Sequence, residues 1–418
     1  MNNWKKVFVI IWTGQFFSVL TSSLVNFAIV IWLSLRTGSA ETLAWATVAA
    51  LLPQAVIGPF TGVLIDRWNR KRVMMLADSF IAFCTLVLAV LFWLDIARMW
   101  HIFILLGLRS VGSAFHMPAM QASVPMLAPA EQLTRIAGVN QIIASVSQIA
   151  GPALGALFIT VWDIGYVLMF DVAGALIAVT SLFFVRIPNP ERKAARARGI
   201  LHEMKEGAMA VLDKRGLSLV FLYSILVLLF LMPVSVLFPL MTFRHFGGTE
   251  FQAGFIEAIW GVGALAGGAV MGVRVYRVNR VALVNWMYLA CGSTFLLSGL
   301  LPPNGYAWFA VLTALAGVSG AVYNSAFTGI IQTKVGPEAL GRVFSMFNTF
   351  SILPSMLGLI GIGFFADGLG LPVSFILCGT AIMLTGVVAF MTPAAMAVDR
   401  TPQAKRSGES RRESGPHE

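Results

Sequence analysis

Charged side chains are scarce in this chain. Asp, Glu, Lys and Arg make up 11% of its 418 residues and hydrophobic residues 58%, whereas an ordinary soluble domain carries about 25% charged residues. The mean hydropathy is +0.82. With so few charged residues, a chain of this length could not cover the surface of a soluble globule. The composition therefore excludes a soluble fold and indicates an integral membrane protein.

Cysteine is also rare. Cys84, Cys291 and Cys378 all lie inside apolar runs and are far apart in sequence. Their spacing excludes a disulfide framework and a cysteine-based metal site, so we interpret them as small buried hydrophobes. The basic and then apolar N-terminus resembles a signal peptide. Its apolar run continues to Leu35 without a small-residue cleavage site, which predicts a retained first span.

Long apolar runs of about 20 residues, the length that crosses a bilayer as a helix, recur twelve times. The runs are continuous rather than alternating, so they predict helices and not a β-barrel. The predicted spans are roughly 7–35, 42–65, 73–94, 99–127, 133–161, 164–185, 217–243, 252–273, 281–301, 305–333, 341–366 and 371–392.

The net charge of +10 is distributed very unevenly between the loops. Of the 29 Lys and Arg residues, 25 fall on the side that holds both termini; the other side has Arg36, Arg98 and Arg244, and Arg109 falls within a span. Because basic loops stay inside, both termini are expected to be cytoplasmic. The positive charge is thus a topology signal and not a nucleic-acid patch.

The chain divides into two related halves. We predict an N-terminal six-helix bundle at 1–186, a cytoplasmic linker with an amphipathic helix at 187–216, a C-terminal bundle at 217–393 and a disordered cytoplasmic tail at 394–418. The segments GVLIDRWNR at 62–70 and GVRVYRVNR at 272–280 share five of nine positions. Duplicated halves of this kind are typical of transporters that bind their cargo between the halves and rock around it.

The loop after the second span reads GVLIDRWNRK. This resembles the signature of the major facilitator superfamily, G-x-L-x-D-R-x-x-R-K, and Tyr276 replaces the aspartate in the degenerate second copy. The resemblance implies an all-α fold of twelve transmembrane helices in two pseudo-symmetric bundles. We expect a cytoplasmic gate in which Asp66 pairs with Arg70 or a helix end. The gate residues are Gly62, Asp66, Arg67, Arg70, Lys71 and Asp78, the last supporting the loop from the third span.

Arg109 lies deep in the fourth span. A charge at that depth is expensive and usually functional, and Arg109 resembles the arginine that the superfamily uses in proton coupling. A purely architectural role, tying together neighbouring carbonyl groups, is the alternative.

In the fifth span, Gly151, Pro152 and Gly155 resemble the antiporter motif of exporters, although Ser147 and Ala156 stand where that motif has glycine.

Acidic residues also occur within spans. Asp171 and Glu257 each share a helix face with small residues, so both are expected to face protein rather than lipid and to carry protons in transit. Glu257 is the favoured proton carrier. For Asp171, a role in proton coupling and a role in a structural ion pair are equally consistent with the sequence. Asp367, at the end of a span, is interpreted as a helix-terminal group.

Polar residues recur at helical spacing on several spans and predict a substrate cavity for an amphipathic cargo. Each residue alone is better explained by interhelical packing, and it is the recurrence over several spans that favours a cavity. The predicted cavity residues are Gln15, Ser22, Asn26, His116, Gln141, Gln148, Asn324 and Asn348, with Phe27, Met117, Trp260 and Phe327 as apolar contacts.

No sequence signature of catalysis, ATP hydrolysis or metal binding is visible, so we expect no enzyme activity and no cofactor. We therefore expect an ion gradient to supply the energy for transport.

The stretches NNWKKVFVIIWTGQ, RTGSAETLA, RSVGSAFHMPAM and EQLTRIAG resemble the macrolide efflux branch of drug:proton antiporters, and the similarity extends over nearly all of 1–392. The resemblance implies proton-driven export of macrolides across a bacterial plasma membrane. Expected partners are the drug, protons and lipid, with the chain a monomer. Alternatives are an exporter of siderophores or other amphipathic metabolites, or a transport-inactive membrane partner protein.

Overall fold

The computed structural model describes residues 4–127, 129, 132–185, 209, 211–273, 278–336 and 340–399. Within these residues twelve helices are long and apolar enough to cross a membrane, which confirms the predicted spans. The first six are α1 (Trp4–Thr37), α2 (Ala40–Arg67), α3 (Arg70–Trp93), α4 (Met99–Leu127), α5 (Leu133–Val161) and α6 (Ile164–Phe183). The others are α8 (Arg215–Val236), α10 (Glu250–Val273), α11 (Arg280–Leu300), α12 (Tyr306–Lys334), α13 (Leu340–Leu369) and α14 (Leu371–Phe390), followed by the short α15 (Pro393–Met396).

The seventh predicted span, 217–243, is interrupted near its end. After α8 the chain continues as α9 (Phe238–Leu240) and the π-helical turn η2 (Met241–His245). Pro233 and Pro239 fall in this region. Because proline has no N–H and its ring crowds the preceding turn, regular α-helical bonding does not run unbroken through the span.

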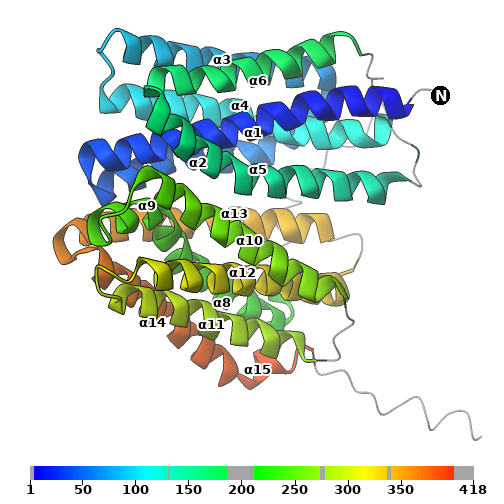
Figure 1. Cartoon of the computed structure of the whole chain (residues 1–418). Coiled ribbons are helices and arrows are strands. Elements are labelled where there is room, and N and C mark those ends of the chain that lie inside the picture. The colour runs from blue at the N-terminus through cyan, green and yellow to red at the C-terminus, as the bar shows by residue number, and fades with distance from the viewer. Residues whose placement is uncertain are drawn as a thin grey trace, which may run out of the picture.

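The helices form two bundles with the same internal arrangement (Figure 1). In the N-terminal bundle, α1 packs on α5 and α6, α2 on α4, and α3 on α4 and α6. In the C-terminal bundle, α8 packs on α13 and α14, α10 on α12, and α11 on α12 and α14. The corresponding contacts establish two pseudo-symmetric six-helix bundles.

The repeated loop sequence produces the same local structure in both bundles. Asn69 Oδ1 accepts a hydrogen bond of 3.0 Å from the backbone N–H of Arg72 and begins α3. Asn279 Oδ1 accepts one of 3.0 Å from the N–H of Ala282 and begins α11. Asparagine is a preferred helix N-cap, so the duplicated Asn-Arg pair starts the third helix of each bundle.

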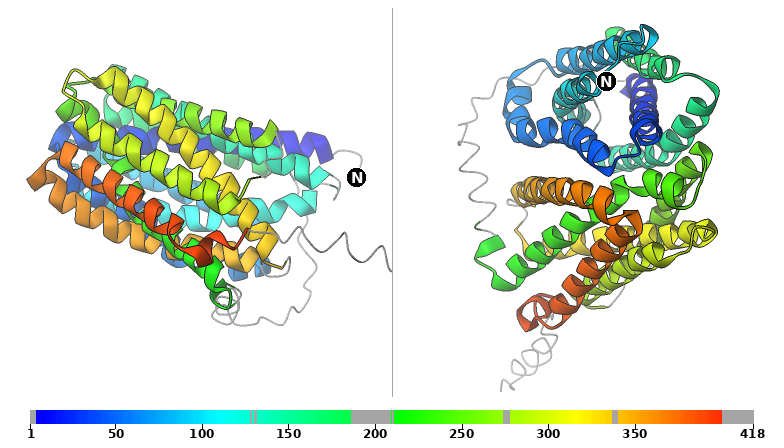
Figure 2. Two further views of the ribbon diagram at one scale, coloured as in Figure 1. Left: turned by 90° about the horizontal axis from the view of Figure 1, so that it is seen from below. Right: turned by 90° about the vertical axis from the view of Figure 1, so that its left-hand side faces the viewer.

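The two bundles meet through α2 with α13 and α5 with α10. We call the end that carries Trp4 the terminal face, and the opposite end, with the turns at Gly38 and Gly370, the far face (Figures 1 and 2). Near the far face, a Cβ on Gly363 of α13 would contact Ala44 of α2. A Cβ on Gly254 of α10 would contact Ala156 of α5.

Toward the terminal face the same two interfaces open. Among the described residues, a Cβ built on Gly58 of α2 or Gly268 of α10 would meet no atom within 4 Å beyond its own stretch of helix. The bundles therefore touch near the far face and diverge toward the terminal face. Most of the predicted linker (187–208 and 210) and of the predicted tail (400–418) lies outside the described residues, so the boundaries 187–216 and 394–418 remain predictions.

Candidate functional site

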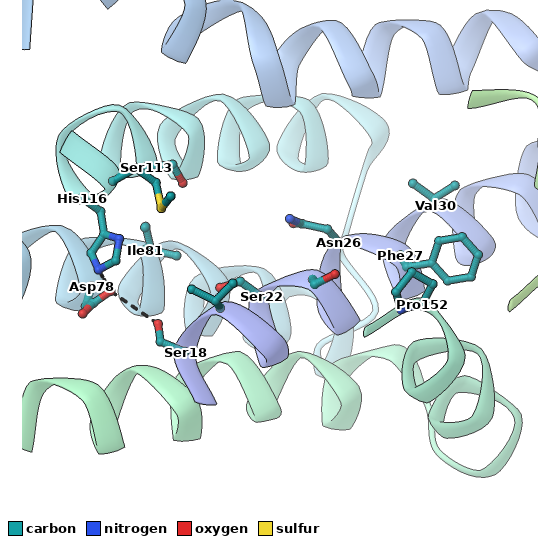
Figure 3. A pocket seen from close by; sticks show the side chains of 13 residues that line it. Ser18, Ser22, Asn26, Phe27, Val30, Asp78, Ile81, Ser113, His116 and Pro152 are labelled. Carbon is teal, nitrogen blue, oxygen red and sulfur yellow. Dashed lines mark hydrogen bonds and ion pairs between the residues drawn. The ribbon is translucent and has the colours of Figure 1, made fainter. Parts of the chain in front are cut away.

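A cavity of about 460 Å³ lies within the N-terminal bundle. It is lined by α1, α3, α4 and α5, and it brings together five of the predicted cavity residues: Ser22, Asn26, Phe27, His116 and Met117 (Figure 3). Its wall combines hydroxyl, amide and apolar groups, the mixture expected for an amphipathic ligand.

Asp78 lines this cavity, although we expected it to support the loop at 62–71. Its Oδ1 lies 3.2 Å from Nε2 of His116, and its carboxylate also accepts a weaker hydrogen bond of 3.4 Å from Ser18 (Figure 3). A further hydrogen bond of 3.4 Å comes from the side-chain amide of Gln15. Asp78 and His116 are 3% and 7% exposed. The acid is thus held by α1 and α4 inside the bundle, and Gln15 acts as its support rather than as a cavity residue.

Arg109 and Asp171 form a buried ion pair between α4 and α6. One guanidinium nitrogen of Arg109 lies 3.0 Å from Oδ2 of Asp171, and the two side chains are 6% and 1% exposed. Asp171 also accepts hydrogen bonds from Ser22 and, at 2.7 Å, from Thr85. The other terminal nitrogen of Arg109 has no hydrogen-bond partner among the described residues. Because Ser22 also lines the cavity, the ion pair is linked to the cavity wall through one hydroxyl group.

The glycines of the fifth span allow close packing on α1. A Cβ on Gly151 would collide with Ser23, and one on Gly155 with the carbonyl oxygen of Leu24. Pro152, between them, lines the cavity, and its carbonyl oxygen lies against Gly254 of α10. The motif therefore stands where α1, the cavity and the C-terminal bundle meet.

A second cavity, of about 350 Å³, lies in the C-terminal bundle among α8, α9, α10 and α13. Glu257 and Trp260 of α10 line it, together with Phe238 and the hydroxyl groups of Ser351 and Ser355. The carboxyl group of Glu257 has no hydrogen-bond or ion-pair partner among the described residues. The sequence indicated one central cavity, whereas the structure divides its residues between two.

Other predicted cavity residues lie elsewhere. Phe327 is 2% exposed and packs against Phe221 and Phe347 in the aromatic core of the C-terminal bundle. Gln148 and Asn324 are exposed and line neither cavity. The side chains of Gln141 and Asn348 lie outside the described part of the structure.

The predicted gate loop is described only in part. Gly62 is part of α2, the side chains of Asp66 and Arg67 lie outside the described residues, and Arg70 is buried as the first residue of α3. Lys71 donates hydrogen bonds to the carbonyl oxygens of Phe183, at 3.1 Å, and Val185, at 2.7 Å. Lys71 therefore stabilises the C-terminal end of α6, where a positive charge is favourable.

Sequence reasoning missed a contact between the bundles at the far face. Asp367, at the end of α13, caps the N-terminus of α2: it accepts hydrogen bonds from the backbone N–H of Ala40, at 2.9 Å, and of Glu41, at 3.2 Å. Arg244 of η2 donates a 2.7 Å hydrogen bond to the carbonyl oxygen of Gly38 and lies 3.8 Å from Asp367. The sequence marked Asp367 as a helix-terminal group, but the helix end that it caps belongs to the other bundle.

Comparison with known proteins identifies the family. The sequence profile described as Major Facilitator Superfamily matches residues 11–247 and 220–416. Macrolide efflux protein A of Streptococcus pyogenes is 38% identical over 93% of this chain and 96% of its own length. The chain belongs to the Major Facilitator Superfamily. Its relatives support the macrolide efflux branch of that superfamily and an efflux transporter in a bacterial membrane.

Two further comparisons agree with the assignment. The multidrug efflux pump Tap of Mycobacterium tuberculosis is 28% identical over 89% of this chain and 90% of its own length. The crystal structure of the nucleoside transporter NupG has a TM-score of 0.73 at 12% identity, over 91% of this chain and 99% of that one. A bacterial homologue of ferroportin in the inward-facing state also scores 0.73, at 12% identity over 92% and 98%. These two structures support the fold.

Proposed function

We propose that this protein is a proton-coupled exporter of macrolides and similar amphipathic drugs. The observation that carries the proposal is Glu257, an ionisable side chain on the wall of a membrane-embedded cavity with no described partner. An acid within a membrane span is expensive unless it is neutralised. Taking up and releasing a proton neutralises it reversibly. The cargo class rests on the similarity to macrolide efflux protein A.

The proposal assigns both termini to the cytoplasm, because the basic loops lie on the terminal face. The far face is then the outer face. The bundles touch at the far face and diverge toward the terminal face, so the described conformation corresponds to a cytoplasm-open state. Arg109 and Asp171 form the second coupling element, because their ion pair shares Ser22 with the cavity of the N-terminal bundle.

The direct test is drug susceptibility in a pump-deleted bacterial host. Wild-type protein raises the inhibitory concentration of erythromycin, and Glu257→Gln, at matched membrane expression, abolishes the increase. Glu250→Gln is the control, because Glu250 lies on the same helix but not on the cavity wall. Accumulated drug must rise to the level of the empty host when an uncoupler is added. Resistance that survives both the uncoupler and Glu257→Gln contradicts proton coupling through this residue.

A further inference from the structure

The cavity of the N-terminal bundle presents no unbalanced charge to a ligand. The one acid among its described lining residues is Asp78, which is 3% exposed. Side-chain groups of His116, Ser18 and Gln15 lie within 3.4 Å of that carboxylate. The described lining includes no Lys or Arg side chain. Because charged ligands need a counter-charge in a site withdrawn from water, this wall is suited to a neutral group.

One face of α1 runs along the cavity and carries polar side chains four residues apart. Ser18, Ser22 and Asn26 have the spacing that places residues on one face of a helix, and all three line the cavity. Ser18 donates its hydrogen to Asp78, at 3.4 Å. Ser22 donates its hydrogen to Asp171. Asn26 makes no hydrogen bond with any described residue, so its amide is free to bind a ligand.

A second free group comes from α4. The hydroxyl group of Ser113 also lines the cavity and has no hydrogen-bond partner in the described part of the chain. Figure 3 shows the amide of Asn26 turned toward the part of the cavity that holds Ser113. An amide has two N–H donors and an acceptor oxygen, and a hydroxyl group both donates and accepts. The free polar groups are thus neutral, and they stand beside the apolar side chains of Phe27 and Met117.

We propose that this cavity binds a neutral, hydroxylated part of the cargo, such as a sugar, and that Asn26 selects for its hydroxyl groups. A cargo hydroxyl both donates and accepts, so it matches the amide of Asn26 and the hydroxyl group of Ser113. The carbon–hydrogen face of a sugar is apolar and packs on Phe27 and Met117. A volume of about 460 Å³ is in the usual range for ligand pockets. This inference rests on the proposed function and adds a hydroxyl requirement to it.

The test compares two probes that differ in their sugar hydroxyl groups. One is erythromycin, and the other is erythromycin acetylated on both of its free sugar hydroxyl groups, which keeps the lactone ring and the amine. Binding to purified full-length protein is measured by calorimetry in a detergent without a sugar headgroup, because such a headgroup would compete for the cavity. Wild-type protein is expected to bind erythromycin about tenfold more tightly than the diacetyl derivative, since a neutral hydrogen bond contributes roughly two- to tenfold in affinity.

Variants separate hydrogen bonding from loss of folding. Asn26→Leu removes the amide with little change in side-chain size. It is expected to bind erythromycin about tenfold more weakly and the diacetyl derivative as wild-type protein does, so the preference disappears. Ser113→Ala removes the group on the other helix and should reduce the preference without abolishing it. Asn304→Leu is the control, because Asn304 is an exposed amide in the turn between α11 and α12 that lines neither cavity, and it should keep the wild-type preference.

Two results overturn the inference. One is equal affinity of wild-type protein for the two probes. The other is a preference for erythromycin that Asn26→Leu retains in full, because the acetyl groups are then excluded by their size and not by the loss of hydrogen bonds to the amide.

Transport in proteoliposomes distinguishes failure of this inference from failure of the proposed function. A pH gradient is expected to drive uptake of erythromycin at a lower half-saturating concentration than uptake of the diacetyl derivative. Uptake of both probes at the same half-saturating concentration leaves the proposed function standing and removes the hydroxyl requirement. Absence of proton-driven uptake of either probe removes the proposed function, whereas the preference measured in detergent still reports on Asn26.

Discussion

The carboxylate of Asp367 lies 2.8 Å from the hydroxyl group of Ser39, and these two residues belong to different bundles. Ser39 is the N-cap of α2, and Asp367 stands in the last turn of α13. The positive end of a helix dipole favours a carboxylate, and the exposed N–H groups of the first turn lack partners within the helix. The C-terminal bundle thus completes the cap of a helix in the N-terminal bundle and closes the far face.

Removing this carboxylate is expected to loosen the far face. Val48 lies between α2 and α13 in a small buried cluster with Met356 and Leu359. In a variant without the native cysteines, Val48→Cys should react slowly with a membrane-impermeant maleimide added to intact cells. Asp367→Ala should raise the rate roughly tenfold, because hydrogen bonds to a charged group contribute about 1.5–3 kcal/mol and 1.4 kcal/mol is a factor of ten.

Asp163→Ala is the matched control for this experiment. Asp163 is an exposed acid in the N-cap position of α6, between α5 and α6, and its side chain makes no capping hydrogen bond. The labelling rate should be that of the parent protein. An unchanged rate in Asp367→Ala would show that apolar packing alone holds the far face closed.

Replacing one member of the Arg109–Asp171 ion pair by a neutral residue should strongly destabilise the protein. Arg109→Gln leaves a buried carboxylate, and Asp171→Asn leaves a buried guanidinium group that already has one unpaired nitrogen. Loss of one partner of a buried pair typically costs about 3–5 kcal/mol. The double variant removes both charges and should recover most of the thermal stability, measured by unfolding of the purified protein in detergent.

Transport by the double variant separates coupling from architecture. If the pair takes part in coupling, as proposed, a stable Arg109→Gln/Asp171→Asn protein fails to lower drug accumulation in cells. Normal export by this variant would assign the pair a structural role.

The repeated asparagine caps offer a test of the internal symmetry. Asn69→Ala removes an N-cap of about 1 kcal/mol, which for a chain of this size lowers Tm by roughly 1–2 °C. Asn279→Ala should cost more, because Asn279 also donates a 3.1 Å hydrogen bond to the carbonyl oxygen of Met396. Asn69→Asp keeps the capping acceptor and should leave Tm unchanged. A larger loss from Asn69→Ala than from Asn279→Ala would contradict this account.

The sequence predicted the spans well because a membrane span is a local property. About 20 apolar residues in succession are sufficient to define one, and the duplicated loop related the two bundles. Whether an individual side chain faces the core of a bundle, a cavity or lipid could not be predicted in the same way. Lipid is as apolar as a helix interface, so Phe327 in the core and Trp260 on a cavity wall stand in similar sequence surroundings.

The pairing of the charges was equally invisible to the sequence. Arg109, Asp171 and Glu257 were each identifiable as costly intramembrane charges. Their sequence positions do not show that the first two neutralise one another and that the third has no described partner. We assigned Asp78 to the gate loop because it is close to that loop in sequence. In the folded structure, however, its side chain contacts Ser18 of α1 and His116 of α4.

Two glycines with opposite surroundings give the last prediction. A Cβ on Gly155 would meet the backbone of Leu24, whereas one on Gly268 would meet no atom of another described helix within 4 Å. Gly155→Ala should therefore destabilise the protein by about 1–3 kcal/mol, the usual cost of overpacking. Gly268→Ala should stabilise the described conformation by about 0.5–1 kcal/mol, because alanine is the better helix former.

The effect of Gly268→Ala on transport should be the reverse of its effect on stability. If the bundles rock during transport, the terminal-face parts of α2 and α10 must approach the opposite bundle, and Gly268 then leaves its open surroundings. An added methyl group would favour the conformation described here and slow the cycle. We therefore expect a higher Tm together with higher drug accumulation in cells, and the same for Gly58→Ala, its counterpart in α2. A higher Tm with undiminished export would show that α10 remains open at this position throughout the cycle.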